Sequence, residues 1–322
     1  MLNILTFIFL IALVILLGWL VTRAWRLKRA VVKWLGVGLA GLLTLLLVAI
    51  TVVAGIGFYK LNVAPYRYSL SAVKVAGTEE QIARGKRLAH LCADCHSSAG
   101  ALPLDGSKDN MLAGGPPLGV IYAPNLTPGG PLRNWTDGEI IRALREGVDN
   151  RTRPLVFMPS QGLHGVSDAD AEAMVAYLRS QPAVDRNLPA RDLNVFAAVF
   201  IGSGMFPTSA QPPLTQPVAR PAAGTPEYGK YIVMNFGCPD CHGANLAGGA
   251  AGGFAPVGPN LTVIVPAWKE ADFITVFRKG TDPSGIAIRE TMPWKSYAQA
   301  LSDDELKDAY QYLHSLTPIV KP

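Results

Sequence analysis

The chain has 322 residues, which is room for about two domains of ordinary size, and 49% of its residues are hydrophobic, a fraction that suggests a membrane component. Its formal charge of +5 is unevenly distributed, because six of the 29 basic residues lie at or before Lys60 and no acidic residue precedes Thr78. The rest of the chain therefore holds 23 basic against 24 acidic residues. Such a nearly neutral body has no basic patch for nucleic acid, so nucleic-acid binding is excluded.

The first segment, residues 1–60, is predicted to be a two-helix transmembrane anchor. Residues 2–22 and 34–59 carry no charged side chain, and each run has the length of roughly 20 residues that a helix needs to cross about 30 Å of hydrocarbon. The loop between them holds five basic residues and no acidic one, so the positive-inside rule places it in the cytoplasm. Everything after Tyr59 is then expected on the periplasmic side of a bacterial inner membrane. The alternative, a cleaved signal peptide, would have a basic start and a shorter apolar core.

Two later segments, residues 76–182 and 225–322, repeat the same features in the same order. Each is expected to open and close with a capped helix, the caps being Thr78 and Ser167 in the first segment and Thr225 and Ser302 in the second. Between these helices lie Cys-x-x-Cys-His, Pro-Asn-Leu-Thr, a helix that ends at glycine, and Met-Pro. In the first segment the three motifs begin at Cys92, Pro124 and Met158, and the helix ends at Gly147. In the second segment the motifs begin at Cys238, Pro259 and Met292, and the helix ends at Gly280. The pattern indicates a duplicated domain, and the lack of strand alternation predicts a mostly helical fold.

The connector between the two segments, residues 183–224, has two parts. Residues 193–206 are apolar but too short to span a bilayer, so we expect a buried or interfacial helix that packs on the first domain or on the membrane surface. Five prolines between Pro207 and Pro221 then predict a stiff, extended tether. We hypothesise that this tether lets the second domain swing between partners.

A histidine directly follows each pair of cysteines, in Cys92-Ala93-Asp94-Cys95-His96 and in Cys238-Pro239-Asp240-Cys241-His242. Two thiols three positions apart on a helical turn can form thioethers with one porphyrin, and the next histidine is then held beneath the iron. The motifs predict two covalent haem c groups, attached at Cys92, Cys95, Cys238 and Cys241, with His96 and His242 as iron ligands. Two disulfides, a zinc ribbon or a thioredoxin-like site are alternatives. A zinc ribbon does not need the histidines, and a thioredoxin-like site would need a βαβ setting.

Met158 and Met292 are predicted to be the sixth ligands of the two irons. Both precede a proline in a loop ahead of the final helix of their domain, and a methionine ligand raises the potential of haem iron for electron transfer. His164 is the alternative ligand in the first domain, since it lies six residues past Met158 and has no counterpart in the second. Met174 is expected to fill the core, because it lies on the apolar face of a helix.

The two domains resemble the mitochondrial-type cytochrome c fold, which has an N-terminal helix, the Cys-x-x-Cys-His turn, a Gly-Pro-x-Leu loop, a Met-Pro loop and a C-terminal helix. The sequence Gly258-Pro259-Asn260-Leu261 matches that loop in the second domain. The resemblance implies that the Pro259 carbonyl accepts a hydrogen bond from the ligand histidine, which orients the ring. In the first domain, Pro124 lacks the preceding glycine, and Gly115-Pro116-Pro117-Leu118 is a second candidate.

Taken together, the chain is similar to the cytochrome subunits of membrane-bound alcohol, aldehyde and gluconate dehydrogenases. The order of a two-span anchor followed by two haem domains is also similar to that of the di-haem subunit of some haem-copper oxidases. The resemblance implies electron transfer through two His/Met haems, without substrate chemistry of its own, as part of a respiratory or photosynthetic complex. The expected partners are the lipid bilayer and a redox protein: a membrane-bound dehydrogenase, a quinol-oxidising complex or a terminal oxidase. A di-haem peroxidase is the alternative, and it would need an open or displaceable distal site.

Overall fold

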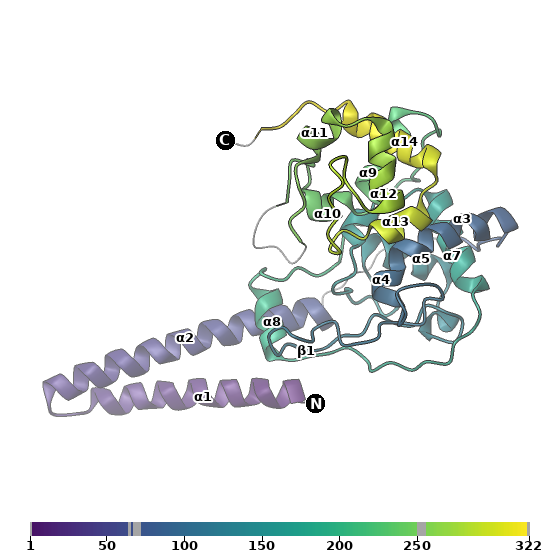
Figure 1. Ribbon diagram of the computed structural model, residues 1–322. Helices are drawn as coiled ribbons and strands as arrows, with labels where there is room; N and C mark the ends of the chain where they lie inside the picture. Colours follow the sequence, from purple (N-terminus) through teal and green to yellow (C-terminus); the bar gives the residue numbers. More distant parts are fainter. Residues whose placement is uncertain (1, 64–65, 67–71, 250–255, 321–322) are drawn as a thin grey trace. The chain divides into compact units, whose positions relative to one another are not determined.

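The computed structural model describes residues 2–63, 66, 72–249 and 256–320, and it is mostly helical, as predicted (Figure 1). In the described part of the chain the only named strands are two residues long each. The chain forms two compact units. We call the first, made of residues 1–66, 110–121 and 189–208, the hairpin unit. The second, residues 67–109, 122–188 and 209–322, contains most of both repeats and is called the repeat unit.

The hairpin unit contains the two apolar helices predicted from the sequence, α1 (Leu2–Trp25) and α2 (Ala30–Asn62). Both are long and apolar enough to cross a membrane, and few of their residues are buried. They lie side by side as an antiparallel pair (Figure 1). Trp25 and Trp34 meet edge to face at the loop end of the pair, and the Lys33 ammonium lies over the Trp25 ring. Basic and aromatic side chains therefore gather where the helices are connected.

The apolar segment 193–206 contains a helix, α8 (Val195–Gly202), which also belongs to the hairpin unit. It follows strand β2 (Asp192–Leu193), which pairs antiparallel with β1 (Gly119–Val120). The helix itself was predicted, but its observed partner is α2, which the sequence did not indicate. The reason is a pair of glycines, Gly57 and Gly202, that allow the two backbones to touch.

The repeat unit is built on two crossed pairs of helices, each joining the first and last helix of one repeat. In the first repeat α3 (Glu79–Ala89) crosses α7 (Asp168–Ser180), and in the second α9 (Pro226–Asn235) crosses α14 (Asp303–His314). The crossings need glycine: a Cβ at Gly85 would lie 1.8 Å from the Ala173 carbonyl oxygen, and one at Gly229 would lie 1.9 Å from that of Asp308. The four predicted cap residues, Thr78, Ser167, Thr225 and Ser302, all accept a backbone N–H at the start of these helices.

The elements between the crossed helices follow the same plan in both repeats. They are η1 (His90–Cys92), α4 (Ala93–His96), η2 (Pro131–Asn134), α5 (Asp137–Glu146) and α6 (Ser160–Leu163) in the first repeat, and α10 (Cys238–His242), α11 (Leu261–Ile264), η3 (Val265–Ala267), α12 (Glu270–Lys279) and α13 (Trp294–Ala300) in the second. Gly147 ends α5 with φ 64° and ψ 31°, and Gly280 ends α12 with φ 68° and ψ 32°. Only glycine adopts this left-handed conformation without strain, which explains its recurrence.

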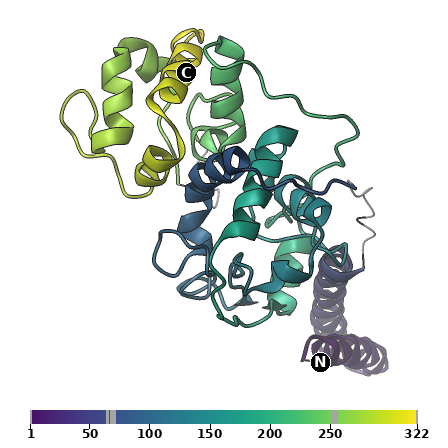
Figure 2. The same ribbon diagram turned by 90° about the vertical axis from the view of Figure 1, so that its right-hand side faces the viewer.

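The two repeats share one hydrophobic core. Leu88, Val166 and Met174 of the first repeat are buried in the same cluster as Ile232 and Leu306 of the second. Met174 is therefore a core residue, as predicted. The second repeat, green to yellow, lies against the blue and teal first repeat (Figure 2). This shared core contradicts the hypothesis that the second domain swings freely.

The proline-rich tether is also attached to the first repeat. The backbone N–H of Gln211 donates to the Glu146 carbonyl, and the N–H of Leu214 donates to the Glu146 carboxylate. Further on, the N–H of Val218 donates to Asp168, and Arg220 pairs with Asp170 at 3.1 Å. The tether is thus extended, as its prolines predict, but it follows the protein surface as a bound strap.

Candidate functional site

The first Cys-x-x-Cys-His motif forms a single helical turn that buries its histidine. Cys92 ends η1, and the chain continues directly into α4, which ends at His96. The Nδ1 atom of His96 lies 2.9 Å from the Pro124 carbonyl oxygen. Burial lowers the pKa of His96, with the Pro124 carbonyl opposing the shift, so the ring is neutral near pH 7. A neutral imidazole whose Nδ1–H is held by a carbonyl leaves Nε2 as the metal-binding atom.

The second motif repeats this geometry in α10. The Nδ1 atom of His242 lies 2.8 Å from the Pro259 carbonyl oxygen, and burial again lowers the pKa of the ring. A Cβ at Gly258 would lie 2.7 Å from Nδ1, which explains the glycine of the Gly-Pro-x-Leu motif. In the first repeat Ala123 precedes the proline, yet the bond from His96 is equally short.

Pro124 is therefore the orienting proline of the first repeat, and the question left open by the sequence is answered. The competing prolines, Pro116 and Pro117, belong to residues 110–121 of the hairpin unit. The first repeat thus has a long insertion between its histidine and its proline. The Pro-Asn-Leu motif resumes after that insertion, so the spacing differs between the repeats while the hydrogen bond is retained.

All four cysteines lie in the described part of the chain, and none of them forms a disulfide there. Burial raises the pKa of Cys92 and of Cys238 to about 12, so both thiols are neutral near pH 7. The described residues also contain no group of three or more His, Cys, Asp or Glu side chains that could hold a metal ion. Those residues therefore offer no zinc-ribbon ligand set, whereas two thiols and one oriented histidine per turn fit a covalent haem.

The recurring Pro-Asn-Leu-Thr motif fastens the chain that follows each final helix. The Asn125 side-chain oxygen accepts from the backbone N–H and the hydroxyl of Thr127, and the Asn125 amide donates to the Val184 carbonyl at 2.8 Å. In the second repeat Asn260 makes the same bonds to Thr262, and it donates to the Ile319 carbonyl at 2.7 Å. The motif therefore fixes the proline carbonyl by tying it to the end of the domain.

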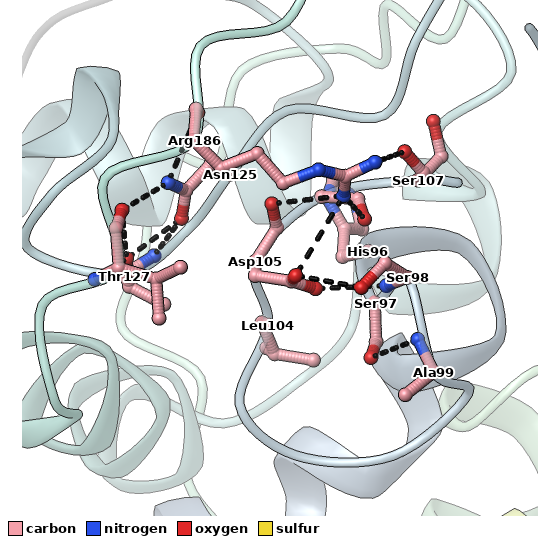
Figure 3. Close-up of polar contacts among 12 residues, drawn as sticks. His96, Ser97, Ser98, Ala99, Leu104, Asp105, Ser107, Asn125, Thr127 and Arg186 are labelled. Carbon is pink, nitrogen blue, oxygen red and sulfur yellow. Dashed lines mark hydrogen bonds and ion pairs between the residues drawn. The ribbon is translucent and has the colours of Figure 1, made fainter. Parts of the chain in front are cut away.

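The loop after His96 is held by its own polar network (Figure 3). The Gly106 N–H donates to the His96 carbonyl at 2.7 Å, and the Ser98 N–H and hydroxyl both donate to Asp105. Arg186 then donates to the carbonyls of Gly106 and Ser107 at 2.6 and 2.8 Å. These bonds hold the backbone around His96, which limits how far the ring can shift.

Met158 and Met292 occupy matching places ahead of α6 and α13. The prolines that follow them cap these helices with nearly identical torsions, φ −79° and ψ 50° for Pro159 and φ −78° and ψ 52° for Pro293. Both methionines are partly buried. His164, the alternative ligand, has its Nδ1 atom 3.0 Å from the Arg145 carbonyl oxygen.

Each methionine-loop helix contacts the attachment turn of the other repeat. The Ser296 hydroxyl of α13 donates to the Asp94 carboxylate of the first turn at 3.1 Å. At the matching place in α6, a Cβ on Gly162 would lie 3.0 Å from the Asp240 carboxylate of the second turn. Because both aspartates lie between the cysteines of their motif, both attachment turns border the interface between the repeats.

Sequence reasoning missed a buried ionic cluster in this interface. Arg84 of α3 donates to Asp170 of α7 at 2.9 Å and pairs with Glu305 of α14. Tyr228 and Tyr231 of α9 donate to Glu305 and Asp170 at 2.9 and 2.7 Å, so each carboxylate binds groups from both repeats. Burial alone would raise the pKa of Asp170, but the hydrogen bond and charge of Arg84 outweigh it and lower that pKa.

One signal could have led to this cluster. Gly85-Lys86-Arg87-Leu88 and Gly229-Lys230-Tyr231-Ile232 share a Gly-Lys-x-apolar pattern, with Arg84 and Tyr228 just before it. Aligning the repeats on these glycines would have placed Arg84 and Tyr228 at equivalent positions. The pairing with Glu305 would still have required the three-dimensional structure.

These features define a c-type cytochrome: a turn with two thiols, a buried histidine oriented by a proline carbonyl, and crossed terminal helices. The chain belongs to the cytochrome c family, whose family model matches residues 82–182 and 226–317. Membership implies covalently attached haem c.

Two relatives show the kind of cytochrome to which the chain is similar. It is 28% identical over 277 residues to one of the subunits of nicotinate dehydrogenase from Pseudomonas putida, a match that covers 78% of this chain and 23% of the relative. It is 35% identical over 101 residues to the fructose dehydrogenase cytochrome subunit of Gluconobacter japonicus, covering 30% of this chain and 20% of the relative. The chain thus spans about a fifth to a quarter of the length of these relatives. The predicted resemblance to dehydrogenase cytochrome subunits is confirmed, and it supports electron transfer in an oxidoreductase complex.

Proposed function

We propose that the chain is a membrane-anchored electron-transfer subunit that carries two haem c groups. Cys92 and Cys95 would attach the first and Cys238 and Cys241 the second. The observation that carries the proposal is the duplicated pairing of a buried histidine with a proline carbonyl, at 2.9 Å for His96 and 2.8 Å for His242. A bound haem supplies an iron centre that accepts and releases one electron at a time.

His96 and His242 are proposed as the proximal ligands, and Met158 and Met292 as the distal ones. The matching backbone at the two Met-Pro pairs supports equivalent roles for both methionines. His164 is a weaker candidate than Met158, because it has no counterpart in the second repeat, whereas Met158 is matched by Met292. Two methionine-capped irons suit a carrier rather than a peroxidase, which needs an open site.

The interface between the repeats supports direct electron passage inside the chain. The Asp94–Ser296 hydrogen bond connects the first attachment turn with a residue four positions after Met292. The contact of Gly162 with Asp240 connects the second turn with a residue four positions after Met158. Two pseudo-equivalent contacts thus join the surroundings of one haem site with those of the other.

We propose that α1 and α2 anchor the chain in a bacterial inner membrane, with the haem-carrying repeats in the periplasm. The five basic residues between the two uncharged runs, Arg23 to Lys33, support a cytoplasmic connection. Covalent haem attachment outside the cytoplasm agrees with this orientation. The proposed electron donor is the catalytic subunit of a dehydrogenase, by analogy with the relatives, and the acceptor is a quinone-linked or oxidase complex.

A pyridine haemochrome assay together with an optical redox titration of the detergent-solubilised protein tests the proposal. We expect two c-type haems per chain, both low-spin, with the weak absorption near 695 nm that His/Met ligation gives in this family. One haem per chain would refute the two-site assignment. A high-spin iron in the resting protein would refute the pure carrier and favour peroxidase chemistry.

A further inference from the structure

Helix α8 packs on α2 through backbone contact. A Cβ at Gly57 would lie 1.8 Å from the Ala198 carbonyl oxygen, and one at Gly202 would lie 1.9 Å from that of Val53. Small residues four positions apart, Ala198 and Gly202, thus form the contact face of α8. Such close crossing at small residues is the way in which helices associate inside membranes, where apolar side chains gain nothing from meeting one another.

The position of this crossing along α2 sets its depth. If α2 spans the bilayer, as the proposed function requires, its uncharged run starts at Trp34. At 1.5 Å per residue, the roughly 20 residues that cross 30 Å of hydrocarbon end close to Val53. Since α8 touches α2 at Val53 and Gly57, it lies where the hydrocarbon meets the headgroups on the outer side.

The side of α8 that does not contact α2 is apolar and exposed. Ala197, Ala198 and Ile201 are buried, whereas the side chain of Phe196 is 59% exposed and that of Met205, just beyond the helix, is 67% exposed. Residues 193–206 contain no charged side chain. Water would be a poor solvent for this surface, and α2, on which α8 packs, also exposes apolar side chains such as Val52 and Ile56.

The polar groups at both ends of α8 have partners within the hairpin unit. The Asn194 side chain accepts the N–H groups of Phe196 and Ala197, and its amide donates to the Pro117 carbonyl. At the other end, the Lys60 ammonium donates to the Ile201 carbonyl at 3.4 Å. With its ends satisfied in this way, the helix can enter an apolar medium at low cost.

We propose that α8 is a lipid-binding helix that lies in the outer interface of the bilayer, with Phe196 and Met205 among the acyl chains. It would widen the membrane contact of the hairpin and restrict the tilt of α2. The inference rests on the proposed membrane anchoring, and it assigns a lipid surface as the partner of residues 195–205.

The test places a nitroxide spin label on Phe196→Cys in the full haem-loaded protein, reconstituted in phosphatidylcholine–phosphatidylglycerol nanodiscs. Power saturation compares the accessibility of the label to apolar oxygen with that to a water-soluble nickel chelate. Met205→Cys is a second test position should Phe196→Cys fold poorly. Leu42→Cys, in the middle of α2, is the control for the membrane interior, and Ile286→Cys, an exposed apolar residue of the repeat unit, is the control for water.

The expected ratio of oxygen to nickel accessibility at position 196 or 205 lies between those of the two controls and is severalfold above that of Ile286→Cys. A ratio equal to that of Ile286→Cys, with Leu42→Cys in lipid, overturns the proposal for α8 alone. If Leu42→Cys also behaves as exposed to water, the membrane anchoring itself is wrong. Labelling of the parent protein measures the background from the four native cysteines.

Discussion

At the scale of single residues, the pairing of histidine with a proline carbonyl carries most of the chemical information. The hydrogen bond fixes the plane of the imidazole and makes Nδ1 the donor. The sequence predicted this pairing in the second repeat, where Gly258 marks the loop. In the first repeat the insertion displaced the proline, and two loops competed for the same role. A local motif does not show which proline binds the histidine. The answer depends on residues 110–121, which contain the competing prolines and belong to the hairpin unit.

The ligand role of Met158 can be tested against that of His164. Met158→Ala should lower the reduction potential of one haem and weaken the 695 nm absorption, because the iron loses its thioether. His164→Ala should leave both unchanged, since the second repeat has Ala298 and no histidine at the matching position. A redox titration of the two variants beside the parent protein measures this. The opposite outcome would assign His164 as the ligand.

At the scale of helices, sequence patterns among neighbouring residues correctly predicted where several helices begin and end. The four caps, the two apolar spans and the glycine ends of α5 and α12 depend on residues that are neighbours in the sequence, so each could be predicted. The contacts of Arg84 could not, because Asp170 and Glu305 lie 86 and 221 residues further along the chain. The crossing of α8 with α2 was missed for the same reason. The proline content of the tether was a correct sign of extension but said nothing about its attachment.

The ionic cluster makes the association of the repeats depend on pH. Burial opposes the ionisation of Asp170 and Glu305, but Arg84 together with the neighbouring arginines and hydrogen bonds outweighs it and holds the pKa of both carboxyls below their ordinary values. Groups with a lowered folded-state pKa stabilise the fold above about pH 4 and lose that contribution as the pH falls through the folded-state value. The thermal unfolding midpoint should therefore drop below about pH 4.

Arg84→Met separates this effect from general acid unfolding. At pH 7 it leaves two buried carboxylates without their shared cation and should cost about 3–5 kcal/mol of stability. As the pH falls below about 4 and through the lowered folded-state pKa values, both carboxyls become neutral, so the difference from the parent should shrink. Denaturant unfolding at the two pH values measures it. Arg133→Met, whose side chain is exposed and donates to the Gly129 carbonyl, is the control. A deficit independent of pH would show that Arg84 acts mainly by packing.

At the scale of the whole molecule, the contacts between the repeats are expected to control electron passage inside the chain. Gly162→Val would place a branched side chain against the Asp240 carboxylate and should separate the second attachment turn from α6. The rate of electron equilibration between the haems, followed after rapid photoreduction, should fall. Gln161→Val, at the exposed neighbouring position of the same helix, should leave the rate unchanged. Equal rates in both variants would contradict an electron route through this interface.

Because the two repeats share one core, their association does not depend on the covalent connection between them alone. A protease that cut only between Gln211 and Pro217 would sever the sole connection that joins the two repeats in sequence. The halves would still be held by buried Leu88, Ile232 and Leu306 and by the cluster around Arg84. We expect the nicked halves to co-migrate in native size-exclusion chromatography and, when produced from separate genes, to complement each other as fragments. The two repeats are thus expected to associate like the subunits of a heterodimer, joined here within one chain.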